Sequence, residues 1–181
     1  MLKITIPARE LFDERTQTFT STKEQTLQLE HSLVSLSKWE SKWCKAFLNP
    51  KTEKTIEETI DYIKCMTITQ NVDPNVYNFL TSKNIQDIND YIGSPMTATT
   101  FYDNKQNGGN KETVTSELIY YWMISFNIPM ECQKWHLNKL LTLIRVCSVK
   151  NAPPKKMGRK ELSSRYASLN AARRSKLNTT G

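Results

Sequence analysis

The sequence TSELIYYWMISFNIPMECQKWHLNKLLTLIRVC, residues 115–147, carries the strongest fold signal in this chain. Thr115 can cap a helix, and the string LIYYWMISF that follows is apolar on nearly every side of that helix. Pro129 then breaks the chain and opens a second long helix with an apolar face. Because a helix without a polar face is typical of a domain centre, we expect this pair to form a hub on which the other elements pack.

Helical spacing of apolar residues continues upstream of this pair. One helix is expected to begin at residue 32 and to end at Asn49-Pro50, since a residue before proline avoids helical geometry. A second helix is expected from Thr55, whose side chain can cap it while Glu58 reaches back to form a capping box. Both segments therefore predict amphipathic helices.

Turn and loop signals divide the middle of the chain. Asp73-Pro74 is typical of a helix start, with a capping side chain followed by proline at the first helical position. Another helix is expected over 83–92, and Gly93 suits its end. The sequence DNKQNGGNK, residues 103–111, predicts a loop.

Alternating apolar residues near the N-terminus predict strands. Leu2, Ile4 and Ile6 alternate with polar residues, and the sequence TLQL at 26–29 does the same. The simplest arrangement is an antiparallel hairpin. A short β-branched segment over 96–102 is expected to add a strand to that hairpin.

These patterns together predict an α+β fold that is predominantly α-helical. Residues 1–150 are expected to form one globular domain, in which a β-hairpin over 1–31 packs on a helical core over 32–149. Residues 151–181 begin with the Pro-Pro linker NAPP, which cannot continue a helix, and go on to a basic helical tail.

The charge of the chain lies in that tail. The formal net charge is +7, and residues 151–181 contain eight basic residues and one acidic residue, so the first 150 residues are neutral overall. The high isoelectric point therefore describes an appendage rather than the domain. The basic residues of the tail are Lys155, Lys156, Arg159, Lys160, Arg165, Arg173, Arg174 and Lys176.

Cysteine usage and hydropathy favour an intracellular location. The four cysteines form no CxxC pair, and no signal peptide is visible at the N-terminus. The longest apolar run falls far short of the ~20 residues that a membrane span needs. We therefore expect reduced thiols, a cytoplasmic protein and no membrane insertion.

The search for catalytic and metal-binding patterns favours structural interpretations. Cys132 and His136 are spaced for two ligands on one helix, but a structural zinc site needs four, and two buried core residues are the favoured interpretation. Glu57, Glu58 and Asp61 could pair for acid–base chemistry, yet nearby lysines favour a solvated helix face. We predict a protein without catalytic residues, metal or cofactor.

Two features could bind partners. Trp39 and Trp43 stand one helical turn apart, and tryptophan is a frequent interface anchor, although a place in the core is the favoured interpretation for both. The basic tail could bind phosphates, while its stripe of Leu162, Tyr166 and Leu169 also suits docking on a protein. Aromatic residues between the cations, which single-strand binding uses, are limited to Tyr166, so nucleic acid is the less favoured partner of the tail.

Five strings, which occur in the same order over nearly the whole chain, resemble the tail assembly chaperone family of long-tailed, siphovirus-type bacteriophages. They are LQLEHSLVSLSKWESKW (27–43), PMTATTF (95–101), ELIYYWMISFNIP (117–129), WHLNKLLTLIRVC (135–147) and NAPPKKM (151–157). The resemblance implies a non-enzymatic protein that keeps the tape measure protein soluble and recruits tail-tube subunits around it in the host cytoplasm. It also implies the short form of a product that many phages extend by ribosomal frameshifting.

Such a role needs an exposed apolar groove for amphipathic helices, and often a homo-oligomer. Trp39 and Trp43 are the residues we expect in that groove. Two alternatives remain: a structural protein of the tail or head–tail connector that stays in the virion, and a phage protein that binds nucleic acid through the basic tail. An unrecognised hydrolase is the least favoured interpretation.

Overall fold

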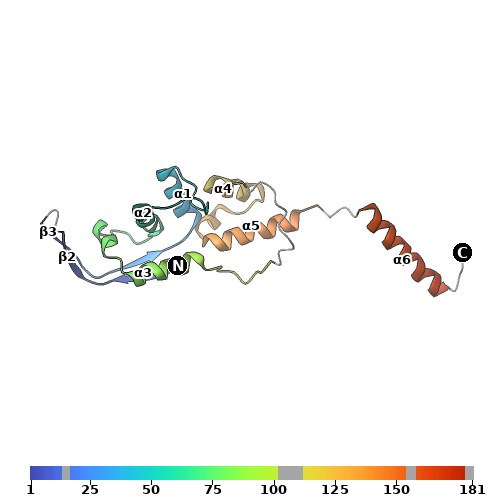
Figure 1. The fold of residues 1–181 in the computed structure, drawn as a ribbon, viewed down its shortest axis with the longest axis horizontal. Helices are drawn as coiled ribbons and strands as arrows, with labels where there is room; N and C mark the ends of the chain where they lie inside the picture. Colours follow the sequence, from blue (N-terminus) through green and yellow to red (C-terminus); the bar gives the residue numbers. More distant parts are fainter. Residues whose placement is uncertain (14–16, 102–111, 154–157, 178–181) are drawn as a thin grey trace. The chain divides into compact units, whose positions relative to one another are not determined.

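The computed structural model describes residues 1–13, 17–101, 112–153 and 158–177. The fold is α+β and mostly helical, as predicted (Figure 1). The chain divides into two compact units, Met1–Ser148 and Val149–Gly181, within two residues of the predicted boundary. The predicted loop over 103–111 lies outside the described residues.

The N-terminal strands form one antiparallel hairpin, which confirms that prediction. Strand β1 (Leu2–Ile6) pairs with β4 (Gln25–Leu29), and β2 (Arg9–Asp13) pairs with β3 (Thr18–Thr22). Both ladders keep the same register, since Ile6 faces Gln25 and Arg9 faces Thr22. Pro7 separates β1 from β2, because proline has no N–H to give to a ladder.

The prediction of a strand over 96–102 is wrong for its described part. Residues 96–101 belong to no strand, and residue 102 lies outside the described range. Met96 has a φ of 48°, in the left-handed region that a non-glycine residue rarely adopts. This conformation turns the backbone and prevents an extended segment from starting there.

The body contains seven helical elements in its described part. In chain order they are α1 (Leu33–Trp43), α2 (Ile56–Met66), the 3₁₀-helix η1 (Pro74–Phe79), α3 (Ser82–Gly93), α4 (Ser116–Ser125), the 3₁₀-helix η2 (Met130–Lys134) and α5 (Leu137–Asn151). The predicted capping box of Thr55 and Glu58 is present, and Thr115 caps α4 as expected. Capping side chains at these starts satisfy backbone N–H groups that have no helical partner.

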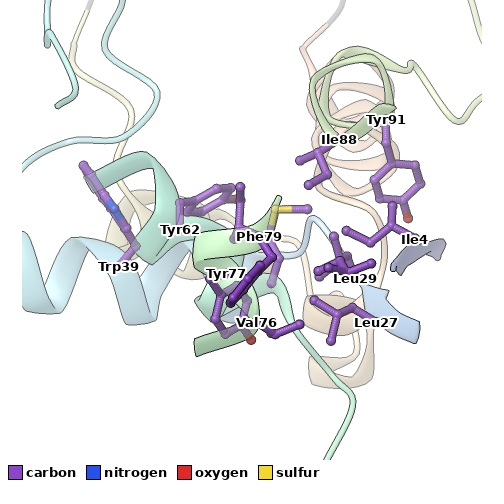
Figure 2. Close-up of a cluster of buried hydrophobic side chains, with 13 residues drawn as sticks. Ile4, Leu27, Leu29, Trp39, Tyr62, Val76, Tyr77, Phe79, Ile88 and Tyr91 are labelled. Carbon is purple, nitrogen blue, oxygen red and sulfur yellow. The ribbon is translucent and has the colours of Figure 1, made fainter. Parts of the chain in front are cut away.

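Helix α1 separates two hydrophobic cores. On one side Trp39 joins a cluster with hairpin residues such as Ile6 and Leu27, together with residues of α2, η1 and α3 (Figure 2). On the other side Leu33 and Leu36 pack with residues of α4, η2 and α5. The predicted hub of 115–147 is therefore wrong: both cores meet at α1, and 115–147 supplies only one of them.

Helix α4 is not the enclosed central helix that its apolar sequence predicts. It buries Ile119 and Met123 completely, but Tyr121 is 62% exposed and Ile124 is 66% exposed. The other elements of the chain cover only the side of α4 that carries Ile119 and Met123, although the helix is apolar all round. The outer face of α4 is consequently an apolar surface.

Two helix ends also differ from prediction. Helix α1 stops at Trp43, because Cys44 adopts a left-handed conformation with a φ of 51°. The expected last helix is split into η2 and α5 by a bridge between Ser32 and His136. The split at His136 comes from a tertiary contact, whereas α1 ends in a left-handed cap in which the Cys44 N–H donates to the Glu40 carbonyl oxygen of the same helix.

The second unit contains the predicted basic helix. Helix α6 runs over Arg159–Leu177, within the tail of residues 151–181 that was predicted to be helical. Its described side chains are all exposed.

Candidate helix-binding groove

One side of α2 is closed against α1 by the two tryptophans of α1. Trp39 is completely buried, and its Nε1 donates a hydrogen bond of 2.8 Å to the carbonyl oxygen of Glu58. The prediction that Trp39 lines an exposed groove is therefore wrong, because its indole is a core side chain. Trp43 is half-buried, and its Nε1 donates to Oδ2 of Asp61 at 2.9 Å. The partner-binding prediction for Trp43 stays a prediction.

Two carboxylates complete this closed side. Lys45 forms an ion pair with the buried Glu58, and Lys42 forms one with Asp61. The Lys45 ammonium and the backbone N–H of Thr55 lower the pKa of Glu58. Burial raises the pKa of Asp61, but hydrogen bonds from Lys42 and Trp43 outweigh it and the net shift is downward. These carboxylates are thus held ionised for structure, in pairs that join α1 to α2.

The opposite side of α2 is open. Helices α2 and α3 do not pack closely against each other, and two adjoining cavities of about 470 and 300 Å³ lie between them. We call this region the isoleucine groove. Its defining residues are Ile56, Ile60 and Ile63 of α2 and Ile85, Ile88 and Ile92 of α3.

Helical spacing explains why the six isoleucines line one groove. On each helix they are separated by three or four residues, which places them along a single stripe. The inner members, Ile63 and Ile88, are 3% and 2% exposed and form the floor. The outer members, Ile56 and Ile85, are 81% and 41% exposed. The groove therefore offers apolar surface that no described part of the body covers.

Lys54 gives the groove a charge. Among the described residues that line the two cavities, it alone is charged. Its Nζ lies 4.3 Å from the ring centroid of Phe47, in a cation–π contact. Burial lowers the pKa of Lys54, and the charge of Glu58 partly opposes that shift. An exposed ammonium at this position favours an occupant that brings a carboxylate to this end of the groove.

A second apolar surface lies where α4 meets α5. A cavity of about 340 Å³ is lined there by Trp122, Phe126, Leu141, Ile144, Arg145 and Ser148. The exposed Tyr121 and Ile124 lie on the same α4 helix. This surface is smaller in volume than the isoleucine groove, and nothing comparable to the two facing isoleucine stripes defines it.

The two histidines lie together between the cores. Their ring centroids are 5.2 Å apart, and His31 Nδ1 pairs with the Tyr62 hydroxyl at 2.6 Å. The backbone N–H of Asn138 donates to His136 Nδ1, so Nε2 carries the proton that is donated to the Tyr91 carbonyl oxygen. Burial lowers the pKa of both rings, to about 4 for His31, where the neighbouring His136 adds to the effect. Both are neutral structural residues at physiological pH.

Cys132 and His136 are both buried, which confirms the favoured interpretation of two core residues rather than a pair of metal ligands. Cys132 is buried in the core of α4 and α5, whereas His136 faces His31 and the Tyr91 ring. Within the described ranges, no group of three or more His, Cys, Asp or Glu side chains is arranged to hold a metal ion.

The basic tail residues are only partly within the described chain. Lys155 and Lys156 lie outside it. The others are exposed on α6: Arg159, Lys160, Arg165, Arg173, Arg174 and Lys176.

Comparison with protein-family models, with curated proteins and with solved structures finds no match to this chain. No helix in the described part of the chain combines the length and the apolar character that crossing a membrane demands.

The sequence predicted helices over both isoleucine stripes without assigning those stripes to a groove. Ile56, Ile60 and Ile63 are spaced as any buried face would be, so their pattern alone does not separate a core from a groove. The available signal was the tryptophan pair of α1. The tryptophan pair packs against one side of α2, so α1 cannot also cover the exposed Ile56 on the opposite side.

Proposed function

We propose that this chain is a bacteriophage tail assembly chaperone that binds amphipathic helices of the tape measure protein in the isoleucine groove. The observation that carries the proposal is the groove itself, with Ile56 and Ile85 exposed on facing helices. The five sequence strings that resemble the chaperone family supply the identity of the partner. The protein acts in the host cytoplasm by binding, without catalysis.

The groove fits a helix better than an extended peptide. Each stripe spans eight residues, from 56 to 63 and from 85 to 92, and the seven steps between its ends rise roughly 10 Å at 1.5 Å per residue. That length receives two turns of a partner helix with apolar residues at i, i+3 or i+4, and i+7. No hydrogen-bonding strand edge lines the groove, so the backbone pairing that an extended peptide uses is missing among the described residues.

Lys54 adds selectivity to this binding. An aspartate or glutamate on the partner helix, beside its apolar stripe, would pair with the exposed ammonium of Lys54. The preferred segment is therefore a helix that combines leucine, isoleucine or methionine at helical spacing with a carboxylate at one end.

The experiment is an affinity pull-down of the tagged full-length chain from nuclease-treated infected cells, with partners identified by mass spectrometry. We expect the tape measure protein and tail-tube subunits to be recovered from cells and the chain to be absent from finished virions. Co-purification with mature particles at fixed copy number would replace the proposal by the alternative of a virion structural protein.

A matched pair of variants assigns the partner to the groove. The double variant Ile56→Ser and Ile85→Ser removes the two exposed groove residues, whereas Ile68→Ser and Ile124→Ser removes two isoleucines that are 51% and 66% exposed elsewhere. We expect the first to lose the tape measure protein at least tenfold and the second to retain it. Equal recovery by both variants would contradict the groove assignment.

A further inference from the structure

Helix α6 segregates its residues in a way that a general solubilising tail would not need. Projected at about 3.6 residues per turn, five of its six cationic residues fall on one half of the helix. They are Arg159, Arg165, Arg173, Arg174 and Lys176. Leu162, Tyr166 and Leu169 lie on the same half, while the opposite half holds mainly serine and alanine.

We propose that this cationic face of α6 binds duplex nucleic acid through its phosphate backbone. The proposal goes beyond the groove and rests on different residues. Residues 151–181 carry a net charge of +7, and the first 150 residues carry none. A polyanion is the partner for which such a concentration of charge gives affinity, because each neutralised phosphate releases condensed counterions.

The length and the residue types of the face favour a duplex. From Arg159 to Lys176 the helix rises roughly 26 Å, and the major groove of a duplex admits a single α-helix. Four of the five cations are arginines, whose planar guanidinium groups pair with phosphate through two hydrogen bonds. Single-stranded binding uses aromatic residues between the cations, and here Tyr166 stands alone.

A lipid surface fits the same face less well. An interfacial helix buries a continuous apolar face, and here the stripe of Leu162, Tyr166 and Leu169 meets Arg173 one turn later. Leu162 and Tyr166 would instead contact sugar and base edges as the cations hold the flanking phosphates.

Binding should also raise the helix content of the tail. An isolated helix of this length is marginal in water, and the described side chains of α6 are all exposed. Phosphate contacts would offset the cost of ordering it, as in other basic segments that fold on their target.

The test is fluorescence anisotropy of a 20-base-pair DNA duplex with the full-length chain, titrated at several salt concentrations. Five phosphate contacts predict a slope of log affinity against log salt of about −4.5, which is a fall of roughly 500-fold between 50 and 200 mM salt. The triple variant Arg173→Gln, Arg174→Gln and Lys176→Gln should bring the slope to about −2.

A charge-matched control keeps the proposal falsifiable. Lys38→Gln, Lys51→Gln and Lys134→Gln remove the same charge from exposed residues of the body and should leave the slope unchanged. An equal loss in both triple variants would show nonspecific attraction and overturn the proposal. Displacement of the duplex by an equimolar polyglutamate peptide would overturn it too, since the face would then fit an acidic protein.

Discussion

The two sides of α2 differ in packing: one side packs against α1, and the other lines the isoleucine groove. On the side that faces α1, the helix carries Glu58 and Asp61. These residues contact a buried indole and two lysines through hydrogen bonds and ion pairs. On the side that faces α3, the helix carries three isoleucines, which line two adjoining cavities. Polarity alone therefore does not identify the exposed side of a helix, since here the two carboxylates are buried and Ile56 is exposed.

The largest expected effect is on the closed side. Trp39→Ala removes a fully buried indole and a hydrogen bond to the Glu58 carbonyl, and should lower the free energy of unfolding by about 3–5 kcal/mol. Urea denaturation followed by circular dichroism measures this loss. Trp43→Ala, at a half-buried position, should cost clearly less, and an equal cost would contradict the closed-side description.

Acidification should lower the free energy of unfolding through His31, which lies between the two cores. The folded-state pKa of His31 is about 4, below its unfolded value of 6.5, so the unfolded chain binds more protons as the pH falls. Stability is complete above pH 6.5 and should be lower by about 2 kcal/mol at pH 5. Urea denaturation at pH 7 and pH 5 measures the difference.

The control for this pH effect is His31→Asn, which keeps a polar group near Tyr62 but does not titrate. Its stability should change less between pH 7 and pH 5. A pH dependence equal to that of the unsubstituted chain would assign the effect to another group, such as His136, whose pKa burial also lowers.

A smaller effect is expected at the start of α2, which both sides share. Thr55→Ala removes the side chain that accepts a hydrogen bond from the Glu58 N–H. Loss of such a cap costs about 1 kcal/mol. Thermal unfolding should show a modest decrease, and no decrease would mean that the Lys45 pair alone fixes the helix start.

The smallest effect on stability is expected in the groove. Ile56→Ser changes a residue that is 81% exposed, so the free energy of unfolding should shift by less than about 0.5 kcal/mol. Denaturation in urea measures it against Ile63→Ser, which lies in the core on the same stripe and should be strongly destabilised. A large loss in Ile56→Ser would show that the groove is part of the core.

Local signals predicted much of the fold, while tertiary contacts decided the rest. The capping box at Thr55 and the alternation of Leu2, Ile4 and Ile6 act within a few residues, and both predictions are confirmed. The break at His136 depends on a bridge to Ser32, which lies far along the chain, and the left-handed turn at Cys44 that ends α1 has no glycine or proline to signal it.

The candidate site was predicted in kind but not in place. An apolar groove for helices was expected, but it was assigned to Trp39 and Trp43, because tryptophan is a frequent interface anchor. Whether a stripe faces a core or solvent depends on which helix packs against it. The side chain of Trp39 fills the contact between α1 and α2, and on the opposite side of α2 only Ile56 and the facing Ile85 of α3 stay exposed among the groove isoleucines.

The most direct test of the groove is site-specific photo-crosslinking in infected cells. A benzoyl-phenylalanine side chain is placed at position 56 in one variant and at position 121, on the exposed face of α4, in another. The account predicts an adduct with the tape measure protein from position 56 and none from position 121. Adducts from position 121 alone would contradict it and move the partner site to α4.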